Sequence, residues 1–186
     1  MRTFIAFAFA LLLSGCSTLG PTGPGGGGAT LDVLRDDVGS VLVAFDLPRT
    51  LGPAPSGQLF TYDAANGGQG EHLRLLLVPA DVDTMAGSLP PPEAGRAYYL
   101  FGFSEADKAS LRAAQALANG RGLTAKDITV GIVPHLCTVG AVDPNVETVT
   151  IVAGVPGQTR LSPFLDHQLL ADLLRQPGST QMPACL

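Results

Sequence analysis

The stretch Arg96-Ala-Tyr-Tyr-Leu-Phe-Gly-Phe103 decides the fold class, because it is apolar on both of its faces. Successive side chains of an extended chain point to opposite sides, so these residues divide into two sets. Tyr98 and Leu100 share one side, and Tyr99, Phe101 and Phe103 share the other. Two apolar faces are typical of a central strand covered on both sides. An aromatic platform for a ligand is the alternative interpretation, and core packing is the one we favour.

Other stretches alternate between apolar and polar residues, which is typical of half-buried strands. In residues 71–78, Leu73, Leu75 and Leu77 fall on one side and His72, Arg74 and Leu76 fall on the other. This stretch and residues 58–62 predict a β-hairpin, joined by a loop rich in Asn and Gly. The predicted strands are residues 40–47, 58–62, 71–78, 96–103, 127–133 and 147–152.

Two helices are predicted in the second half of the chain. Ser104 is a suitable N-cap, acidic residues follow it, and Asn119-Gly120 is a suitable end, so we predict a helix at about 104–119. Ser162-Pro163 is a second start signal. A stripe of leucines follows it and predicts a helix at about 163–176. The predicted fold class is α+β, a predominantly antiparallel β sheet or β-sandwich with these two helices, in a single domain spanning residues 31–186.

Residues 17–30 consist of Gly, Pro, Ser, Thr, Ala and one Leu, with four consecutive glycines at 25–28. A segment of this composition cannot bury apolar surface, so we expect a flexible tether. A phosphate-binding loop is the alternative for a glycine run. The sequence argues against it, because no predicted strand precedes the glycines and no Gly-Lys-Ser/Thr follows them.

The N-terminus resembles the signal peptide of bacterial lipoproteins. Arg2 precedes ten apolar residues at 4–13, and Leu13-Ser14-Gly15-Cys16 resembles the lipobox of that class. The resemblance implies that residues 1–15 are removed and that Cys16 is acylated, so that residues 16–30 form a lipidated tether. Two or more acyl chains give durable attachment to a lipid bilayer. Ser17, rather than Asp, follows the cysteine, and by the same resemblance this favours the outer membrane, facing the periplasm.

If Cys16 is acylated, Cys137 and Cys185 are the remaining thiols. An even pair of cysteines in an exported chain predicts a disulfide. The chain-entropy model gives roughly 4 kcal/mol of stabilisation for a loop of this size. Half of a metal site at His135-Leu136-Cys137 is the alternative, and no second ligand pair has matching spacing. We therefore predict no metal site.

The charge and the motifs exclude several classes of function. Loss of Arg2 with the leader takes the formal charge from −5 to −6, and no basic cluster is present to bind nucleic acid. No nucleophile elbow, metalloprotease or nucleotide-binding motif occurs, so we predict no catalytic residues, no cofactor and no enzyme. The leading hypothesis is a binding or assembly module that contacts another envelope protein. The alternatives are a structural or stress-related envelope lipoprotein without a dedicated ligand, and an enzyme with an unrecognised site.

Overall fold

The computed structural model describes residues 31–66, 69–158, 161–175 and 182–185. The predicted leader, Cys16 and the tether at 16–30 lie outside these residues. Within the described residues, nine strands and two α-helices have the following bounds: β1 Leu42–Pro48, β2 Leu51–Pro53, β3 Gln58–Asn66, β4 Gln69–Ala80, β5 Arg96–Gly102, α1 Glu105–Gly120, β6 Ile128–Val133, β7 Leu136–Thr138, β8 Thr148–Gly154, β9 Ser162–Leu169 and α2 Leu170–Leu174. None of the helices in these parts of the chain is long and apolar enough to cross a membrane.

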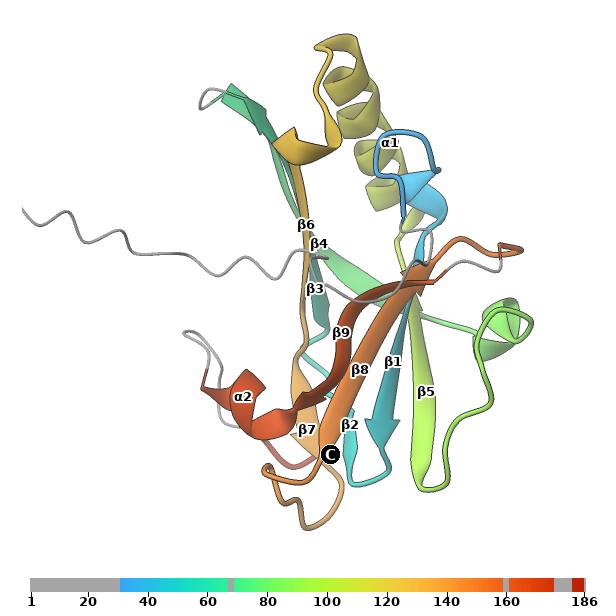
Figure 1. Cartoon of the computed structure of the whole chain (residues 1–186), viewed down its shortest axis with the longest axis vertical. Helices are drawn as coiled ribbons and strands as arrows, with labels where there is room; N and C mark the ends of the chain where they lie inside the picture. Colours follow the sequence, from blue (N-terminus) through green and yellow to red (C-terminus); the bar gives the residue numbers. More distant parts are fainter. Residues whose placement is uncertain (1–30, 67–68, 159–160, 176–181, 186) are drawn as a thin grey trace, which may run out of the picture.

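Seven strands form one sheet in the order β6-β3-β4-β5-β1-β8-β9, and every neighbouring pair is antiparallel. The sheet curls into a nearly closed barrel, with β6 and β9 as its two edge strands (Figure 1). β2 and β7 form a separate two-stranded ribbon. The predicted α+β class with a predominantly antiparallel sheet is confirmed.

The central position of β5 is confirmed, because apolar clusters cover both of its faces. On the inner face Phe101 packs against Phe45, with 5.1 Å between the ring centroids. These two residues belong to the main core, which fills the barrel. On the outer face Leu100 and Ala44 form a second cluster with Met85, which lies in the 3₁₀ turn Val82–Met85. The aromatic residues of this stretch therefore pack in a core, as the favoured interpretation predicted.

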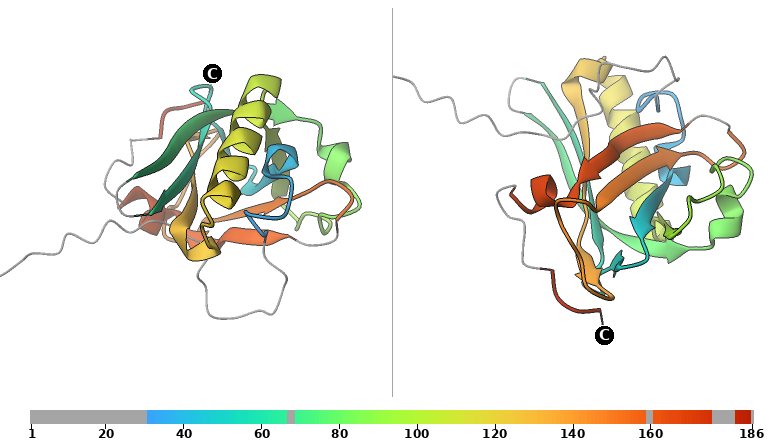
Figure 2. Two further views of the ribbon diagram at one scale, coloured as in Figure 1. Left: turned by 90° about the horizontal axis from the view of Figure 1, so that it is seen from above. Right: turned by 60° about the horizontal axis from the view of Figure 1, so that its bottom comes forward.

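The predicted hairpin is present and longer than expected. β3 and β4 pair continuously from Gln58↔Leu77 to Asn66↔Gln69, through residues that we expected to form a loop. The inward assignment of Leu75 and Leu77 is confirmed, since both are buried. The extra length takes the tip of the hairpin away from the barrel, and α1 packs against its two strands (Figure 2).

The first predicted helix is confirmed as α1. The hydroxyl of Ser104 accepts a hydrogen bond from the backbone N–H of Asp107, which is the expected N-cap. α1 also holds the segment that follows the predicted tether. The side-chain amide of Gln115 donates to the backbone oxygens of Val33 and Asp36. The guanidinium of Arg112 forms an ion pair with Asp37 at 2.8 Å. The residues that lead out of the tether are therefore fixed to the domain through α1.

The second predicted helix is wrong over most of its length. Residues 162–169 form strand β9, which pairs with β8, and only Leu170–Leu174 are helical. The leucine spacing fits both structures, because Leu165 is buried from the strand while Leu170 and Leu173 are buried from the short helix. Pro163 suits an edge strand as well as a helix start. Pairing along the free side of β8 decided between the two.

Candidate functional site

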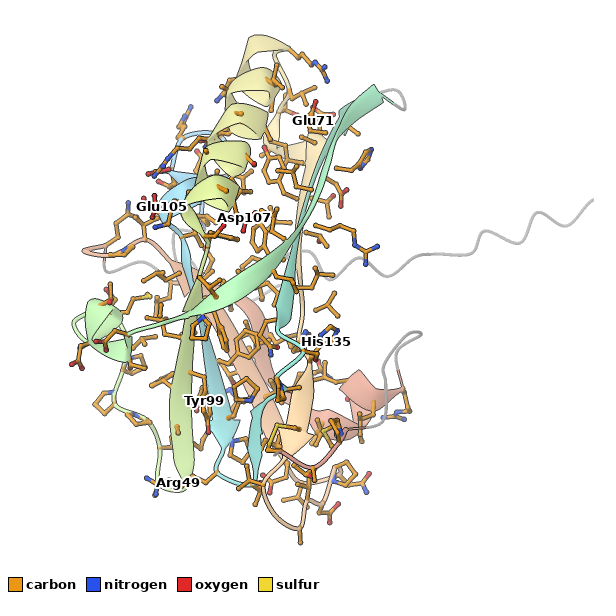
Figure 3. All side chains as sticks on the ribbon, turned by 180° about the vertical axis from the view of Figure 1, so that it is seen from behind. Arg49, Glu71, Tyr99, Glu105, Asp107 and His135 are labelled. Carbon is orange, nitrogen blue, oxygen red and sulfur yellow. A yellow bond between two sulfur atoms is a disulfide. The ribbon has the colours of Figure 1, made fainter. Side chains whose placement is uncertain are left out.

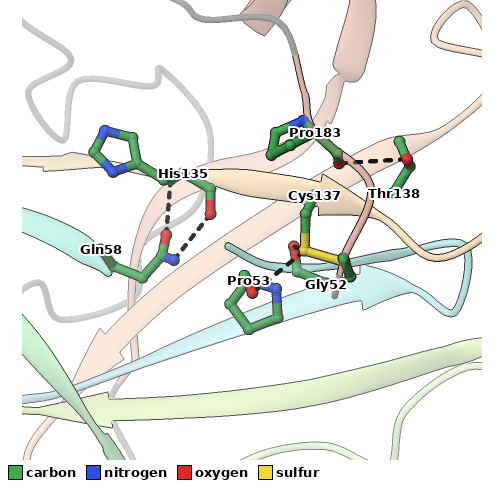
Figure 4. The surroundings of a disulfide bond; sticks show 8 residues. Gly52, Pro53, Gln58, His135, Cys137, Thr138 and Pro183 are labelled. Atoms are coloured by element: carbon green, nitrogen blue, oxygen red, sulfur yellow. Dashed lines mark hydrogen bonds between the residues drawn. A yellow bond between two sulfur atoms is a disulfide. The ribbon is translucent and has the colours of Figure 1, made fainter. Parts of the chain in front are cut away.

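The predicted disulfide joins Cys137 on β7 to Cys185, with an S–S distance of 2.02 Å and 5.0 Å between the Cα atoms. Cys137 is fully buried. Backbone hydrogen bonds reinforce the link: Thr138 N–H donates to the oxygen of Pro183, and Cys185 N–H donates to the oxygen of Thr138, both at 2.8 Å. The C-terminal residues therefore add to the ribbon that β7 forms with β2 (Figure 4).

Gly52 on β2 lies directly beneath the disulfide. A Cβ at this position would be 3.2 Å from Sγ of Cys185 and 3.7 Å from Sγ of Cys137. The sulfur of Cys137 also lies 3.5 Å from the backbone oxygen of Gly52. A side chain at position 52 would therefore crowd the bridge, and the disulfide fixes the end of the chain against β7.

The three histidines lie in separate places, each with a different partner. His72 contacts Asp63 across the β3–β4 hairpin at 2.7 Å, and His167 contacts its neighbour Asp166 at 2.7 Å. His135 contacts the backbone oxygen of Gly57 at 2.8 Å. Within the described residues, no group of three or more His, Cys, Asp or Glu side chains could hold a metal ion. Arg49, Glu71 and His135, which are labelled in Figure 3, lie far apart along the length of the molecule and do not gather at one site.

One ion pair is buried on the outer side of the sheet. The Nε of Arg96 lies 2.9 Å from the carboxylate of Asp46, and the side chains are 10% and 12% exposed. The guanidinium also donates to the backbone oxygens of Asp46 and Thr148. Its donors are therefore directed at groups of the protein, and the pair joins β5, β1 and β8 rather than presenting a charge to a ligand.

Exposed apolar side chains lie next to one another on the outer faces of β6, β3 and β4. They are at the end of the β3–β4 hairpin that is far from its turn. Leu59 on β3 pairs with Val133 on β6 and with Leu76 on β4, so the three side chains lie side by side. Leu76 is 57% exposed and Val133 is 43% exposed. Val78, two residues further along β4 on the same face, is 41% exposed. We call Leu59, Leu76, Val78 and Val133 the outer apolar surface.

The rest of the same face shows how such a surface is covered. One step beyond Val78, on the outer side of β4, Ala80 packs into the cluster formed by Met85 and Leu100. The 3₁₀ turn Val82–Met85 thus covers the apolar face over β5 and β1. It does not extend over Leu76 or Val133, which stay exposed. The protein itself therefore covers the apolar outer face over β5 and β1, and it leaves the outer apolar surface over β4, β3 and β6 exposed.

The sequence placed Leu76 on the outer side of its strand but gave no reason to single it out. Its significance comes from neighbours that are distant in sequence, because Val133 is brought beside it by β3. A count of outward-pointing leucines and valines on each predicted strand would have marked both residues. The order of the strands was needed to show that they are adjacent.

No family model, curated protein or solved structure matches this chain. The candidate site therefore depends on the geometry of the chain itself.

Proposed function

We propose that the protein is a lipid-anchored component of the bacterial cell envelope whose folded domain binds another envelope protein through the outer apolar surface. Cys16 is the acylated residue, the leader 1–15 is absent from the mature protein, and residues 16–30 are the tether. The protein is held at the outer membrane and faces the periplasm. The resemblance to the lipobox supports the anchor, and the disulfide Cys137–Cys185 agrees with an oxidising compartment.

The observation that carries the binding function is the exposure of Leu76, Val78 and Val133 on one face. Contiguous exposed apolar surface on a soluble domain marks interaction sites, because water contact with such a surface is unfavourable. The apolar outer face of the neighbouring strands β5 and β1 is covered by Met85. An apolar partner segment would complete over β4, β3 and β6 what the protein's own chain does over the neighbouring strands.

The anchor is tested by metabolic labelling with radioactive palmitate. The wild-type protein should incorporate label and fractionate with outer membranes, and Cys16→Ala should lose both properties. Cys185→Ser is the matched control, since this cysteine is in the disulfide and should leave labelling unchanged. Label retained in Cys16→Ala would contradict the anchor.

The binding surface is tested by chemical crosslinking in intact cells. Leu76→Asp should abolish the crosslinked product, because a charge would have to be desolvated in the interface. The control is Val146→Asp, an equally drastic change at a residue that is 71% exposed on the loop before β8. A product that survives Leu76→Asp, or the absence of any product in the wild type, would refute the binding function.

A further inference from the structure

The free edge of β6 borders the outer apolar surface. In the described part of the chain, β6 pairs with β3 on one side and has no backbone partner on the other. Its last residue, Val133, is itself a member of the outer apolar surface. A strand edge presents backbone N–H and C=O groups at regular spacing. Another extended backbone lying alongside can form hydrogen bonds with successive groups of this kind.

The two edge strands of the sheet differ in how they are protected. β9 contains Pro163 and the charged residue Asp166, its pairing with β8 has two register shifts, and His167 adopts a φ of 47°. Proline, charge and irregular register are the devices that keep other strands from pairing with an edge. They are concentrated on β9.

β6 has none of these devices. Its sequence Ile-Thr-Val-Gly-Ile-Val contains no proline and no charged residue. It pairs with β3 without interruption from Ile128↔Ala64 to Val133↔Leu59. Four of its six residues are β-branched aliphatic side chains, which favour strand pairing. β6 therefore has the composition and regularity of a strand that can accept a neighbour.

The two longer stretches outside the described residues lack the pattern needed to occupy the edge. After removal of the leader, the longer stretches outside the described residues are 16–30 and 176–181. The first is dominated by Gly and Pro, and the second reads Gln-Pro-Gly-Ser-Thr-Gln. Neither alternates apolar and polar residues, as a strand with one face against an apolar surface must.

We propose that an extended segment of a partner protein adds to the edge of β6 as an antiparallel or parallel strand, with its outward side chains beside Thr129 and Val133. The segment alternates apolar and polar residues. Main-chain hydrogen bonds to β6 give the affinity, and Val133, the member of the outer apolar surface at this edge, favours an apolar side chain beside it, as in other cases of strand addition. This inference rests on the proposed function and names the kind of partner that the site takes.

Site-specific photo-crosslinking in intact cells tests the geometry. A photoreactive amino acid is placed, one position at a time, at Thr129, Val133 or Leu76 of the full chain. Leu76 lies on the outer face of β4, and Thr129 and Val133 lie on the outer face of β6. Gly131 between them is left unchanged, because a Cβ there would lie 2.7 Å from Oγ1 of Thr61. The four residue steps from Thr129 to Val133 span about 13 Å. An extended partner covers this distance in about four residues, whereas a helix needs about nine.

The expected result is that positions 129 and 133 both crosslink to one segment of one partner, at residues about four apart. A photoreactive residue at Val146 is the control and should give no product on that segment. Attachment points about nine residues apart, scattered points, or attachment to a second copy of this chain would each overturn strand addition. Products from position 76 but not from 129 or 133 would overturn it as well, while leaving the proposed function standing. Absence of products at all three positions would reject the proposed function itself.

Discussion

The side-chain amide of Gln58 forms two hydrogen bonds with the backbone of His135, 77 residues further along the chain. Its nitrogen donates to the backbone oxygen of His135 at 2.9 Å, and its oxygen accepts from the backbone N–H at 2.8 Å. Gln58 is completely buried. The side-chain amide thus makes the two hydrogen bonds that the backbone of a paired strand would make, at the point where the chain leaves β6 and enters β7 (Figure 4). It fixes the corner between the barrel and the disulfide-linked ribbon.

Replacing this amide should destabilise the protein strongly. Gln58→Leu keeps a similar volume but leaves the backbone N–H of His135 without a partner, while the C=O keeps only the bond from the N–H of Ala54. This change costs about 1–3 kcal/mol of unfolding free energy. Urea unfolding of the oxidised protein measures the loss. Gln168→Leu is the control, because its amide bonds to the side chain of Asp172 and should cost less than about 1 kcal/mol. Equal losses in the two variants would contradict the role of Gln58.

The elements that the sequence predicted correctly are those in which one local pattern dominates. β5 followed from a stretch that is apolar on both faces, the β3–β4 hairpin followed from the alternation in residues 71–78, and α1 followed from its cap at Ser104. β9 was missed because its leucines also fit a helix, and its pairing with β8 is a tertiary effect. The ribbon of β2 and β7 was missed because strands of three residues carry no periodicity.

The candidate site was less predictable than the fold. The disulfide followed from cysteine counting, since two thiols remain once the lipobox cysteine is set apart. The outer apolar surface and the free edge of β6 depend on strand order, which joins Leu59 to both Leu76 and Val133. The contact between Gln58 and His135 has no local signal, because a glutamine that bonds to a distant backbone looks like any other polar residue.

The buried ion pair gives a second stability prediction. Arg96→Met should destabilise the protein by about 3–5 kcal/mol, because it leaves the carboxylate of Asp46 buried without its partner. The double variant Asp46→Leu/Arg96→Met should recover much of this loss, since it removes both charges. Thermal unfolding of the wild type, the single variants Arg96→Met and Asp46→Leu, and the double variant completes the cycle. A double variant that is no more stable than Arg96→Met alone would contradict this interpretation.

The disulfide should contribute through the unfolded state. Cys185→Ser should lower the unfolding free energy by roughly 4 kcal/mol, the value expected for opening a loop of this size. Cys137→Ser should cost at least as much, because it also places a hydroxyl in a buried position. Urea unfolding with and without a reducing agent checks both values. If reduction leaves the midpoint of the wild type unchanged, the disulfide does not stabilise the fold.

The ion pair between Asp37 and Arg112 predicts a pH dependence. The guanidinium of Arg112, with the hydroxyl of Ser40, holds the pKa of Asp37 well below its usual range. The pair therefore stabilises the folded state fully above the ordinary aspartate pKa of about 3.9. Below that pH the unfolded state takes up a proton first, so the contribution declines and is lost as the pH falls through the folded pKa.

The measurement is the difference in unfolding free energy between the wild type and Asp37→Asn as a function of pH. The difference should be constant from pH 7 to about 5 and should shrink below about 4. Because both side chains are nearly half exposed, solvent screening keeps the difference small. Asp83→Asn, at an exposed carboxylate, is the control. A difference that grows as the pH falls would contradict the assigned direction.

For Tyr62 we predict the opposite effect, because removal of its hydroxyl should not lower the unfolding free energy. The side chain is fully buried on β3, and its hydroxyl has no hydrogen-bond partner among the residues that the structure describes. Tyr62→Phe should leave the unfolding free energy unchanged or raise it by about 1 kcal/mol, since a buried unpaired hydroxyl is unfavourable. Urea unfolding at pH 7 measures the change, and a loss above about 1 kcal/mol would show that the hydroxyl is bonded.

The same residue should also affect stability in alkali. Burial raises the pKa of Tyr62, so above pH 10 the unfolded state loses its phenolic proton before the folded state does. The unfolding free energy of the wild type should therefore fall as the pH rises past 10, and it should fall less steeply in Tyr62→Phe. Identical slopes for the wild type and Tyr62→Phe would mean that this phenol ionises as readily in the folded protein as in the unfolded chain.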